Sequence, residues 1–377
     1  MSKKNILLIA GEVSADHHGA RLIAELKKLQ SDFHLWGIGG DELQNQGMEV
    51  LFHVEQMSFL GVGEVIRHLP FVRKVMQTIK NRAAQQKPDL AILIDYPGFN
   101  LRLARFLKKM NIPVVYYISP QLWAWGKGRI KTIKQSVDLM LVLFPFEKDF
   151  YEAHGVKAEY VGHPLVDKHH AYLPQNFKQV KEGNVRLGLL PGSRRNEIKS
   201  LLPRMVETAN LLFESGSIHK AVIAKVPHIE ISFYQNLTGI SAERFELTEI
   251  PMEELLPELD AALVTSGTAT LETAYYAVPM VIVYHVNPLT YWLGRLLIKL
   301  THIGLANIVA EEEIAPELIQ HEFTAQKAAH LLQKMLNPQV NEQLRQKMLI
   351  IRQKLGTPGA SQRAAEQIHR FLINEEK

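Results

Sequence analysis

The sequence predicts an α/β protein made of two Rossmann-like domains, whose parallel sheets face each other across a cleft. Short apolar runs alternate with amphipathic helical patterns, which is typical of βαβ units and parallel sheets. The alternation starts again near residue 185, and a chain of 377 residues is long enough for two domains. Since ligands bind beyond the carboxyl ends of strands in such sheets, we expect the turns after the strands to line the cleft.

The first predicted domain, residues 1–167, opens with the buried strand Ile6–Ala10. A turn over residues 11–16 leads into a helix over His17–Leu29, whose apolar residues fall on one face. Further strands are predicted over Leu90–Ile94, Val114–Ile118 and Leu139–Phe144.

The second predicted domain, residues 185–338, follows a polar linker at residues 168–184. Its strands are predicted over Val185–Leu190, Lys220–Ala224, Ala261–Thr265 and Met280–Tyr284. Residues 339–377 contain two helices, Gln339–Leu355 and Ser361–Asn374, and a crossing back to the first domain is one arrangement open to them.

The composition is that of a globular protein, with 46% hydrophobic and 22% charged residues. The absence of cysteine excludes a disulfide, a thiolate metal site and a thiol nucleophile. The net charge of +4 suits an anionic substrate or membrane surface, although it is also common in soluble proteins. No apolar run approaches about eighteen residues, so we expect a soluble or peripheral protein.

A first candidate binding motif spans residues 189–197, where a strand runs into Pro191-Gly192-Ser193-Arg194. Ser193 is expected to cap the following helix, whose free N–H groups and dipole favour an anion. Arg194 adds a planar cation suited to a phosphate. A capped helix with surface arginines would explain this motif equally well on its own.

A second motif spans residues 264–272, where a strand runs into Ser266-Gly267-Thr268 and a helix start suited to a diphosphate. Glu272 follows about a turn and a half into that helix and is placed to hold ribose hydroxyls. Its alternative is a simple first-turn acid favoured by the helix dipole. Two such turns in one domain indicate a nucleotide diphosphate more strongly than either does alone.

The third motif, residues 94–100, places Asp95 at a strand end, where its carboxylate can act as a general base. An aspartate that caps the next helix is the alternative, and the sequence does not separate the two. Neither the G-x-G-x-x-G spacing of dinucleotide sites nor an Asp-x-Asp pair is present. We therefore expect no cofactor and no metal.

An apolar stripe between Leu69 and Ile79, flanked by basic residues, predicts an amphipathic helix. A core-facing helix is the favoured interpretation, and a helix that lies on anionic lipid is the alternative. The neighbouring residues 57–63 are unusually apolar for a loop and would suit either acyl chains or burial.

Together and in this order, these motifs resemble the lipid-A-disaccharide synthase family of GT-B glycosyltransferases. The stretch from Ser119 to Trp125 (Ser-Pro-Gln-Leu-Trp-Ala-Trp) is the most specific part. Ala15 stands where the family usually has glycine, and Gly98 where some members carry a second aspartate. The resembling segments are residues 10–16, 57–65, 95–100, 117–125, 143–147, 160–164, 189–197, 266–272 and 304–307.

The resemblance implies that Asp95 is the catalytic aspartate and that Arg194, Glu272 and Asn307 contact the UDP moiety. It implies an inverting transfer from UDP-2,3-diacylglucosamine to 2,3-diacylglucosamine 1-phosphate, which gives UDP and a β(1→6) lipid A disaccharide. A cytoplasmic protein, peripheral at the inner face of the inner membrane, is expected, and a homodimer is left open. The candidate acceptor and lipid contacts are Ser14, Asp16, Phe59, Trp123 and Trp125.

The nearest rival is a UDP-GlcNAc 2-epimerase-like or peptidoglycan-precursor enzyme on the same fold. It would take a smaller polar substrate, which does not require the aromatic Trp123/Trp125 segment or the apolar loop. A nicotinamide-dependent oxidoreductase would need the missing glycine fingerprint. A nucleotide-binding module without catalysis gives Asp95 no purpose, and the basic residues lack the aromatic interleaving typical of nucleic-acid binding.

Overall fold

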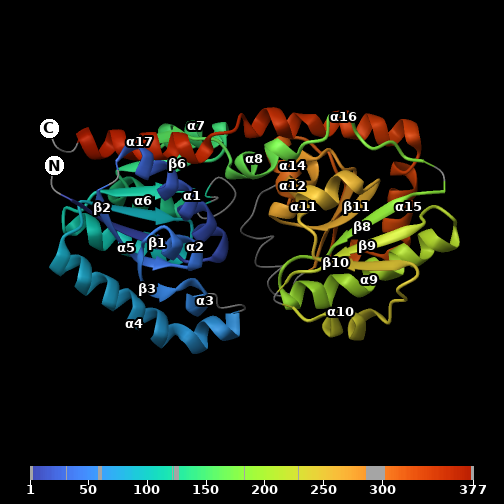
Figure 1. Ribbon diagram of the computed structural model, residues 1–377, viewed down its shortest axis with the longest axis horizontal. Coiled ribbons are helices and arrows are strands. Elements are labelled where there is room, and N and C mark those ends of the chain that lie inside the picture. The colour runs from blue at the N-terminus through green and yellow to red at the C-terminus, as the bar shows by residue number, and fades with distance from the viewer. Residues whose placement is uncertain are drawn as a thin grey trace. The chain divides into compact units, whose positions relative to one another are not determined.

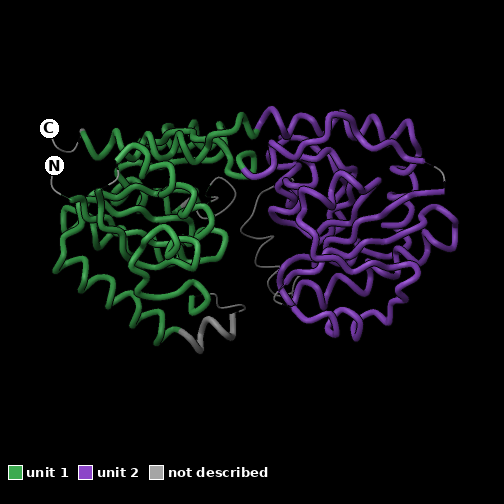
Figure 2. The backbone as a smooth tube through the Cα atoms, in the orientation of Figure 1, with its two compact units in different colours: residues 1–167, 355–377 green, residues 168–354 purple. Residues whose placement is uncertain are grey.

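The computed structural model describes residues 3–30, 32–57, 62–120, 122, 127–181, 183–227, 229–285 and 302–374, with the side chains of 62–68, 127 and 374 left out. The chain forms two compact units (Figure 2). Unit 1 consists of Met1–Asp167 and Leu355–Lys377, and unit 2 of Lys168–Lys354.

Unit 1 is built on a parallel sheet of seven strands in the order β3-β2-β1-β4-β5-β6-β7. The strand order therefore reverses between β1 and β4. The strands β4, β5 and β6 are completely buried, and so is the Ile6–Ala10 part of β1, as expected for a parallel sheet. The strands are β1 (Lys4–Ala10), β2 (Phe33–Gly39), β3 (Glu49–His53), β4 (Leu90–Ile94), β5 (Val114–Tyr117), β6 (Leu139–Val142) and β7 (Ala158–Tyr160).

The helices of unit 1 connect these strands, and the last of them, α17, packs along α1 (Figure 1). They are α1 (Val13–Leu29), α2 (Asp41–Asn45), α3 (Val54–Met57), α4 (Val62–Gln86), α5 (Pro97–Lys109), α6 (Ile130–Ser136), α7 (Pro145–Ala153), α8 (Pro164–His169, which runs into unit 2) and α17 (Ala360–Asn374). A short 3₁₀ helix lies at Lys127–Arg129, and a second one, at His170–Tyr172, belongs to unit 2.

The predicted turn over residues 11–16 is wrong in its second half, because α1 already begins at Val13. The Asp16 N–H donates to the Glu12 carbonyl at 3.0 Å, as a helical residue does. Its carboxylate accepts backbone N–H groups of Gly40 at 2.6 Å, Glu42 at 3.1 Å and Leu43 at 3.2 Å, where α2 begins. Asp16, a residue type typical of turns, therefore links α1 to the start of α2 through its side chain.

The predicted core-facing helix is confirmed by α4, since Val75, Ile79 and Ala83 are fully buried. On the same side, Arg82 pairs with Glu49 and lies over the Trp36 ring, which fixes the helix to the sheet. Among the helices in the described part of the chain, none is both long and apolar enough to cross a membrane.

Unit 2 repeats the same topology with six parallel strands in the order β10-β9-β8-β11-β12-β13, and its order reverses between β8 and β11. The strands predicted over 220–224, 261–265 and 280–284 are confirmed at both ends. The strands are β8 (Arg186–Leu190), β9 (Lys220–Ala224), β10 (Phe245–Thr248), β11 (Ala261–Thr265), β12 (Met280–Tyr284) and β13 (Glu317–Ile319).

The helices of unit 2 end with α16, which is anchored by the buried Arg345. Its guanidinium donates to the carbonyls of Ala277 at 3.1 Å and Leu259 at 2.9 Å. The helices are α9 (Arg195–Glu214), α10 (Ile231–Thr238), α11 (Met252–Leu255), α12 (Thr268–Tyr275), α14 (Leu305–Ala310), α15 (Ala325–Met335) and α16 (Pro338–Leu355).

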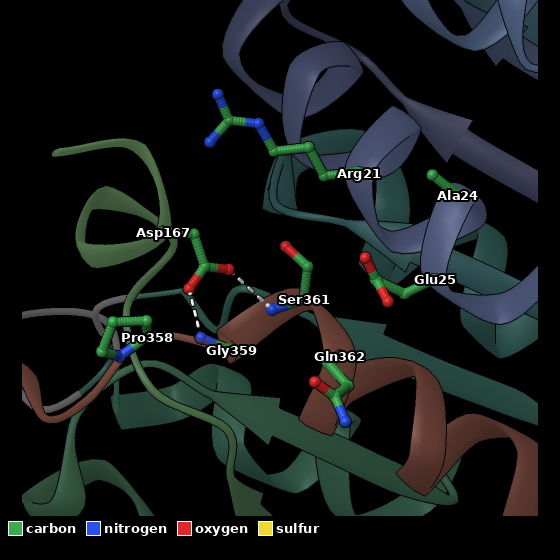
Figure 3. Close-up of a pocket in the computed structure, with 8 residues that line it drawn as sticks. All are labelled: Arg21, Ala24, Glu25, Asp167, Pro358, Gly359, Ser361 and Gln362. Atoms are coloured by element: carbon green, nitrogen blue, oxygen red, sulfur yellow. Dashed lines mark hydrogen bonds between the residues drawn. The ribbon is translucent and has the colours of Figure 1, made fainter. Parts of the chain in front are cut away.

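Asp167, the last residue of the first stretch of unit 1, caps α17 just after the chain has returned to this unit. Its carboxylate accepts the N–H groups of Gly359 at 2.6 Å, Ala360 at 3.0 Å and Ser361 at 3.0 Å. Figure 3 shows Asp167 among the residues that line the neighbouring pocket. Because Asp167 already takes these N–H groups, the start of α17 is not an open anion site.

Candidate active site

Asp95 and the turns that hold Arg194 and Gly267 follow the strands at which the strand order of each sheet reverses. In unit 1, Ala10 at the end of β1 pairs with Ile94 at the end of β4. In unit 2, Leu190 at the end of β8 pairs with Val264 of β11. Open α/β sheets bind ligands in the crevice at such reversals, because the connecting turns splay apart there.

Asp95 directly follows β4 and has an unusual backbone conformation. Both Asp95 and Tyr96 have a φ of +46°, a left-handed conformation that non-glycine residues rarely adopt. The buried Asn100 side chain donates to the carbonyls of Asp95 at 2.7 Å and Ile94 at 3.1 Å. Two adjacent strained residues held this way are a common feature of functional sites.

The surroundings of Asp95 raise its pKa from the ordinary 3.8 to about 6. Burial is the main cause, the like charge of Glu12 adds to it, and a hydrogen bond from the Tyr96 backbone opposes it. The alternative role as a helix cap is wrong. The N-cap of α5 is Tyr96, and none of the described side chains makes a capping hydrogen bond there. Asp95 is therefore a carboxylate whose pKa is close to neutral pH.

In unit 2, the turn after β8 packs tightly against β11. Gly192 has a φ of +103°, and a Cβ at this position would lie 2.6 Å from Glu197 Oε2 and 3.1 Å from Thr265 Cγ2. Only glycine suits both the conformation and the space. The turns that end in Arg194 and Gly267 are therefore side by side at the carboxyl ends of β8 and β11.

The predicted capping role of Ser193 is wrong, because α9 starts later than the motif suggests. Arg194 is the N-cap residue, and none of the described side chains caps the helix through a hydrogen bond. Ser193 is exposed. The Arg194 side chain is 56% exposed and pairs with Glu197 at 3.1 Å. Its guanidinium is thus accessible at the start of a long helix.

The second turn leaves its backbone open to a ligand. Gly267 is the N-cap of α12, and a Cβ there would meet no described atom within 4 Å beyond its chain neighbours. Thr268 beside it is exposed. Ser266 Oγ donates to the Ile303 carbonyl at 3.1 Å, which ties the turn to the segment before α14.

Glu272 is more than a first-turn acid, because a buried histidine contacts it. His169 Nε2 lies 3.1 Å from Glu272 Oε1, and His169 Nδ1 lies 3.2 Å from the Tyr276 hydroxyl. The Glu272 side chain is 19% exposed, so part of the carboxylate reaches the surface.

Asn307 is completely buried, and its side chain is fully hydrogen bonded within the protein. Nδ2 donates to the Ala315 carbonyl at 2.7 Å and to Glu317 Oε1 at 2.8 Å. Oδ1 accepts the N–H groups of Ile314 at 2.9 Å and Ala315 at 3.0 Å. The amide therefore holds the segment between α14 and β13 in place.

The predicted acceptor residues are placed only in part. Ser14 is exposed in the first turn of α1, and the hydrogen bonds of Asp16 to α2 account for its burial. Phe59, Trp123 and Trp125 lie outside the described residues.

Three residues near the site were not predicted: Glu12 beside Asp95, Glu197 beside Gly192, and His169 beside Glu272. Glu12 and Glu197 lie inside the motifs at residues 10–16 and 189–197, so their position within these motifs could have indicated them. His169 is 103 positions from Glu272, and no local pattern links the two.

Comparisons with known proteins agree with the motifs. A family model described as lipid-A-disaccharide synthetase matches residues 6–370. The lipid-A-disaccharide synthase of Myxococcus xanthus is 40% identical over 384 residues, covering 97% of this chain and 97% of the relative. That of Coxiella burnetii is 38% identical over 383 residues, covering 99% and 100%.

Solved structures with the same fold include a UDP-GlcNAc 2-epimerase from Neisseria meningitidis bound to UDP-GlcNAc. Its TM-score is 0.64 at 12% identity, over 97% of this chain and 100% of that one. The calicheamicin glycosyltransferase has a TM-score of 0.62 at 16% identity, over 100% of both chains. These similarities and the two parallel sheets confirm the predicted fold class, that of GT-B proteins.

Proposed function

The chain belongs to the lipid-A-disaccharide synthase family, and we propose that it performs the family's glycosyl transfer with Asp95 as the general base. It is thus a glycosyltransferase of lipid A disaccharide synthesis. We propose UDP-2,3-diacylglucosamine as the donor and 2,3-diacylglucosamine 1-phosphate as the acceptor. The epimerase-like alternative is not favoured, because solved epimerases share only the fold at this level of identity.

The observation that carries the proposal is the Asp95 carboxylate, which burial and Glu12 give a pKa of about 6 at the reversal point of the first sheet. A base is most effective when its pKa lies near the working pH. Asp95 would take the proton from the acceptor 6-hydroxyl as that oxygen bonds to the donor's anomeric carbon. The bond from this carbon to the diphosphate breaks on the opposite face, and UDP leaves with the electron pair.

Unit 2 would bind the nucleotide and stabilise the leaving diphosphate. The adjacent starts of α9 and α12 offer backbone N–H groups, and the accessible Arg194 guanidinium adds a fixed positive charge. Ser193, Ser266, Gly267 and Thr268 would lie along the diphosphate. Glu272 would accept hydrogen bonds from the ribose hydroxyls. Asn307 would hold the segment between α14 and β13 in place beside the nucleotide.

We further propose that the protein works as a peripheral protein at the inner face of the inner membrane. The substrates in this proposal carry acyl chains, so they reside in a lipid surface. Arg73 and Lys74 on α4 are exposed, and exposed cations of this kind are attracted to anionic lipid.

The test is to incubate the purified protein with both proposed substrates, with added Mg²⁺ or EDTA, and to follow UDP and disaccharide together. UDP release coupled to disaccharide formation and indifferent to EDTA is expected. If plain UDP-GlcNAc turned over and this pair did not, the proposed substrates would be wrong and an epimerase-like activity would replace them.

A further inference from the structure

We propose that His169 is a positioning residue of the nucleotide site. Held by Tyr276, it fixes the Glu272 carboxylate so that its remaining acceptor positions face the ribose hydroxyls of the UDP moiety. This inference rests on the proposed function, in which Glu272 binds the ribose.

The contacts of His169 define the direction of its hydrogen bonds. Nε2 lies 3.1 Å from Glu272 Oε1, and an ionised carboxylate only accepts, so Nε2 carries the proton. The Tyr276 hydroxyl lies 3.2 Å from Nδ1. Burial is the main cause that raises the pKa of Tyr276, so this hydroxyl keeps its proton and can donate it to Nδ1. Tyr276, His169 and Glu272 therefore form one directed chain.

His169 is also the closest partner of Glu272 in the described part of the chain. Lys168 Nζ lies 3.8 Å from Glu272 Oε1 and its side chain is 41% exposed, so this ion pair contributes little. Glu253 on α11 faces His169 Nδ1 at 3.8 Å and Lys168 at 3.7 Å. The imidazole itself is completely buried and has an edge-on contact with the Tyr276 ring, at 87° between the ring planes.

The arrangement leaves acceptor capacity free on Glu272. A carboxylate has about four acceptor positions, and the described contacts show His169 using one of them by a hydrogen bond. Two neighbouring ribose hydroxyls need two of the others. Without His169 the Glu272 side chain would have to give up rotamer freedom when the nucleotide binds, which lowers affinity for the hydroxyls specifically.

The test compares the binding of UDP and 2′-deoxy-UDP to the full chain by calorimetry. A hydrogen bond to a charged group contributes about a 10- to 100-fold preference, which we expect in the unsubstituted protein. His169→Leu is expected to reduce this preference to within roughly threefold. His169→Gln keeps a side-chain N–H donor and should retain most of it. The matched control is His170→Leu, at the neighbouring exposed histidine.

A merely structural role would weaken the binding of both nucleotides equally and leave their ratio unchanged, and that result for His169→Leu would overturn the inference. Should His169→Leu not fold, Tyr276→Phe decides, because it removes one hydroxyl and keeps the ring. We expect a reduced ratio, and an unchanged ratio overturns the inference.

Glu272→Gln separates this inference from the proposed function. If it abolishes the preference while the His169 and Tyr276 variants keep it, the nucleotide site stands and the positioning role is wrong. If the unsubstituted protein has no preference for UDP over 2′-deoxy-UDP, the ribose contact of Glu272 and the positioning role of His169 are both wrong.

Discussion

Glu12 and Asp95 follow neighbouring parallel strands, β1 and β4, and the like charge of Glu12 helps to raise the pKa of Asp95 to about 6. Two carboxylates placed together in this way repel one another, so the second proton is held more tightly than in an isolated aspartate. The pairing of Ala10 with Ile94 in the sheet brings Glu12 and Asp95 together. The pKa of the proposed base therefore depends on the register of these two strands.

The first prediction concerns pH. Asp95 acts as a base only when deprotonated, so kcat/KM should rise with pH through about 6 and then level off. Glu12→Gln removes one of the causes that raise this pKa and should move the acidic limb to lower pH. Glu25→Gln, which removes a carboxylate from the middle of α1, is the control and should leave the limb in place. An acidic limb that stays put in Glu12→Gln would remove Glu12 from the site.

The second prediction concerns the effect of Asp95 on turnover and on the stability of the fold. Asp95→Asn should lower turnover by about 10²- to 10⁴-fold. The folded protein raises the pKa of Asp95 from 3.8 to about 6, so its charge destabilises the fold above pH 6 and not below pH 3.8. Because Asp95 is partly exposed, the destabilisation is on the order of 1–3 kcal/mol.

Asp95→Asn should therefore raise the melting temperature near neutral pH and lose this advantage near pH 4. Thermal unfolding at both pH values checks this. Near-normal turnover of Asp95→Asn would show that another group is the base.

The third prediction concerns the diphosphate. Arg194→Ala should reduce kcat by about 10²- to 10³-fold, since a positive charge beside the leaving group acts mainly in the transition state. Arg195→Ala is the matched control, because Arg195 lies over the Phe233 ring. Initial rates at saturating donor measure the difference, and equal losses in the two variants would count against Arg194.

The fourth prediction concerns the tight turn after β8. Gly192→Ala should destabilise the protein by about 1–2 kcal/mol because of its positive φ, and should also weaken UDP binding by displacing Glu197. At Gly98, a Cβ would meet no described atom within 4 Å beyond its chain neighbours, so Gly98→Ala should be tolerated. Unfolding and UDP titration of both variants make the comparison. Unimpaired UDP binding by Gly192→Ala would place the diphosphate elsewhere.

The fifth prediction concerns the membrane. The double variant Arg73→Gln, Lys74→Gln should sediment less with vesicles that contain anionic lipid, by about 1 kcal/mol of binding free energy per charge. Neutral vesicles should show no difference. Equal sedimentation of both proteins with anionic vesicles would move the membrane contact away from α4.

Sequence alone predicted the strands that are fully buried. β4 and β11 are buried along their whole length, and apart from Thr265 they consist of apolar residues. β2 was missed because Gly37 and Gly39 interrupt its apolar pattern, and β7 and β13 because each has three residues. Edge strands this short are specified by their neighbours in the sheet more than by their own residues.

The site was predictable to the extent that its residues share a local motif. Asp95, Arg194 and Glu272 each follow a strand end and could be selected that way. The pKa of Asp95 depends on Glu12, and the orientation of Glu272 on His169. These relations arise only when distant segments pair, so a motif indicates which residues are present and not the environment that tunes them.

The division of unit 1 has a consequence for how the protein is made. The ribosome completes residues 1–167 first, then all of unit 2, and only then the helix α17 that packs along α1. Unit 2 is one continuous stretch and can fold as it emerges. Until then, the face of α1 that packs against α17 has no partner, so unit 1 cannot complete its fold. The part of the chain that is synthesised first is therefore the last to become complete.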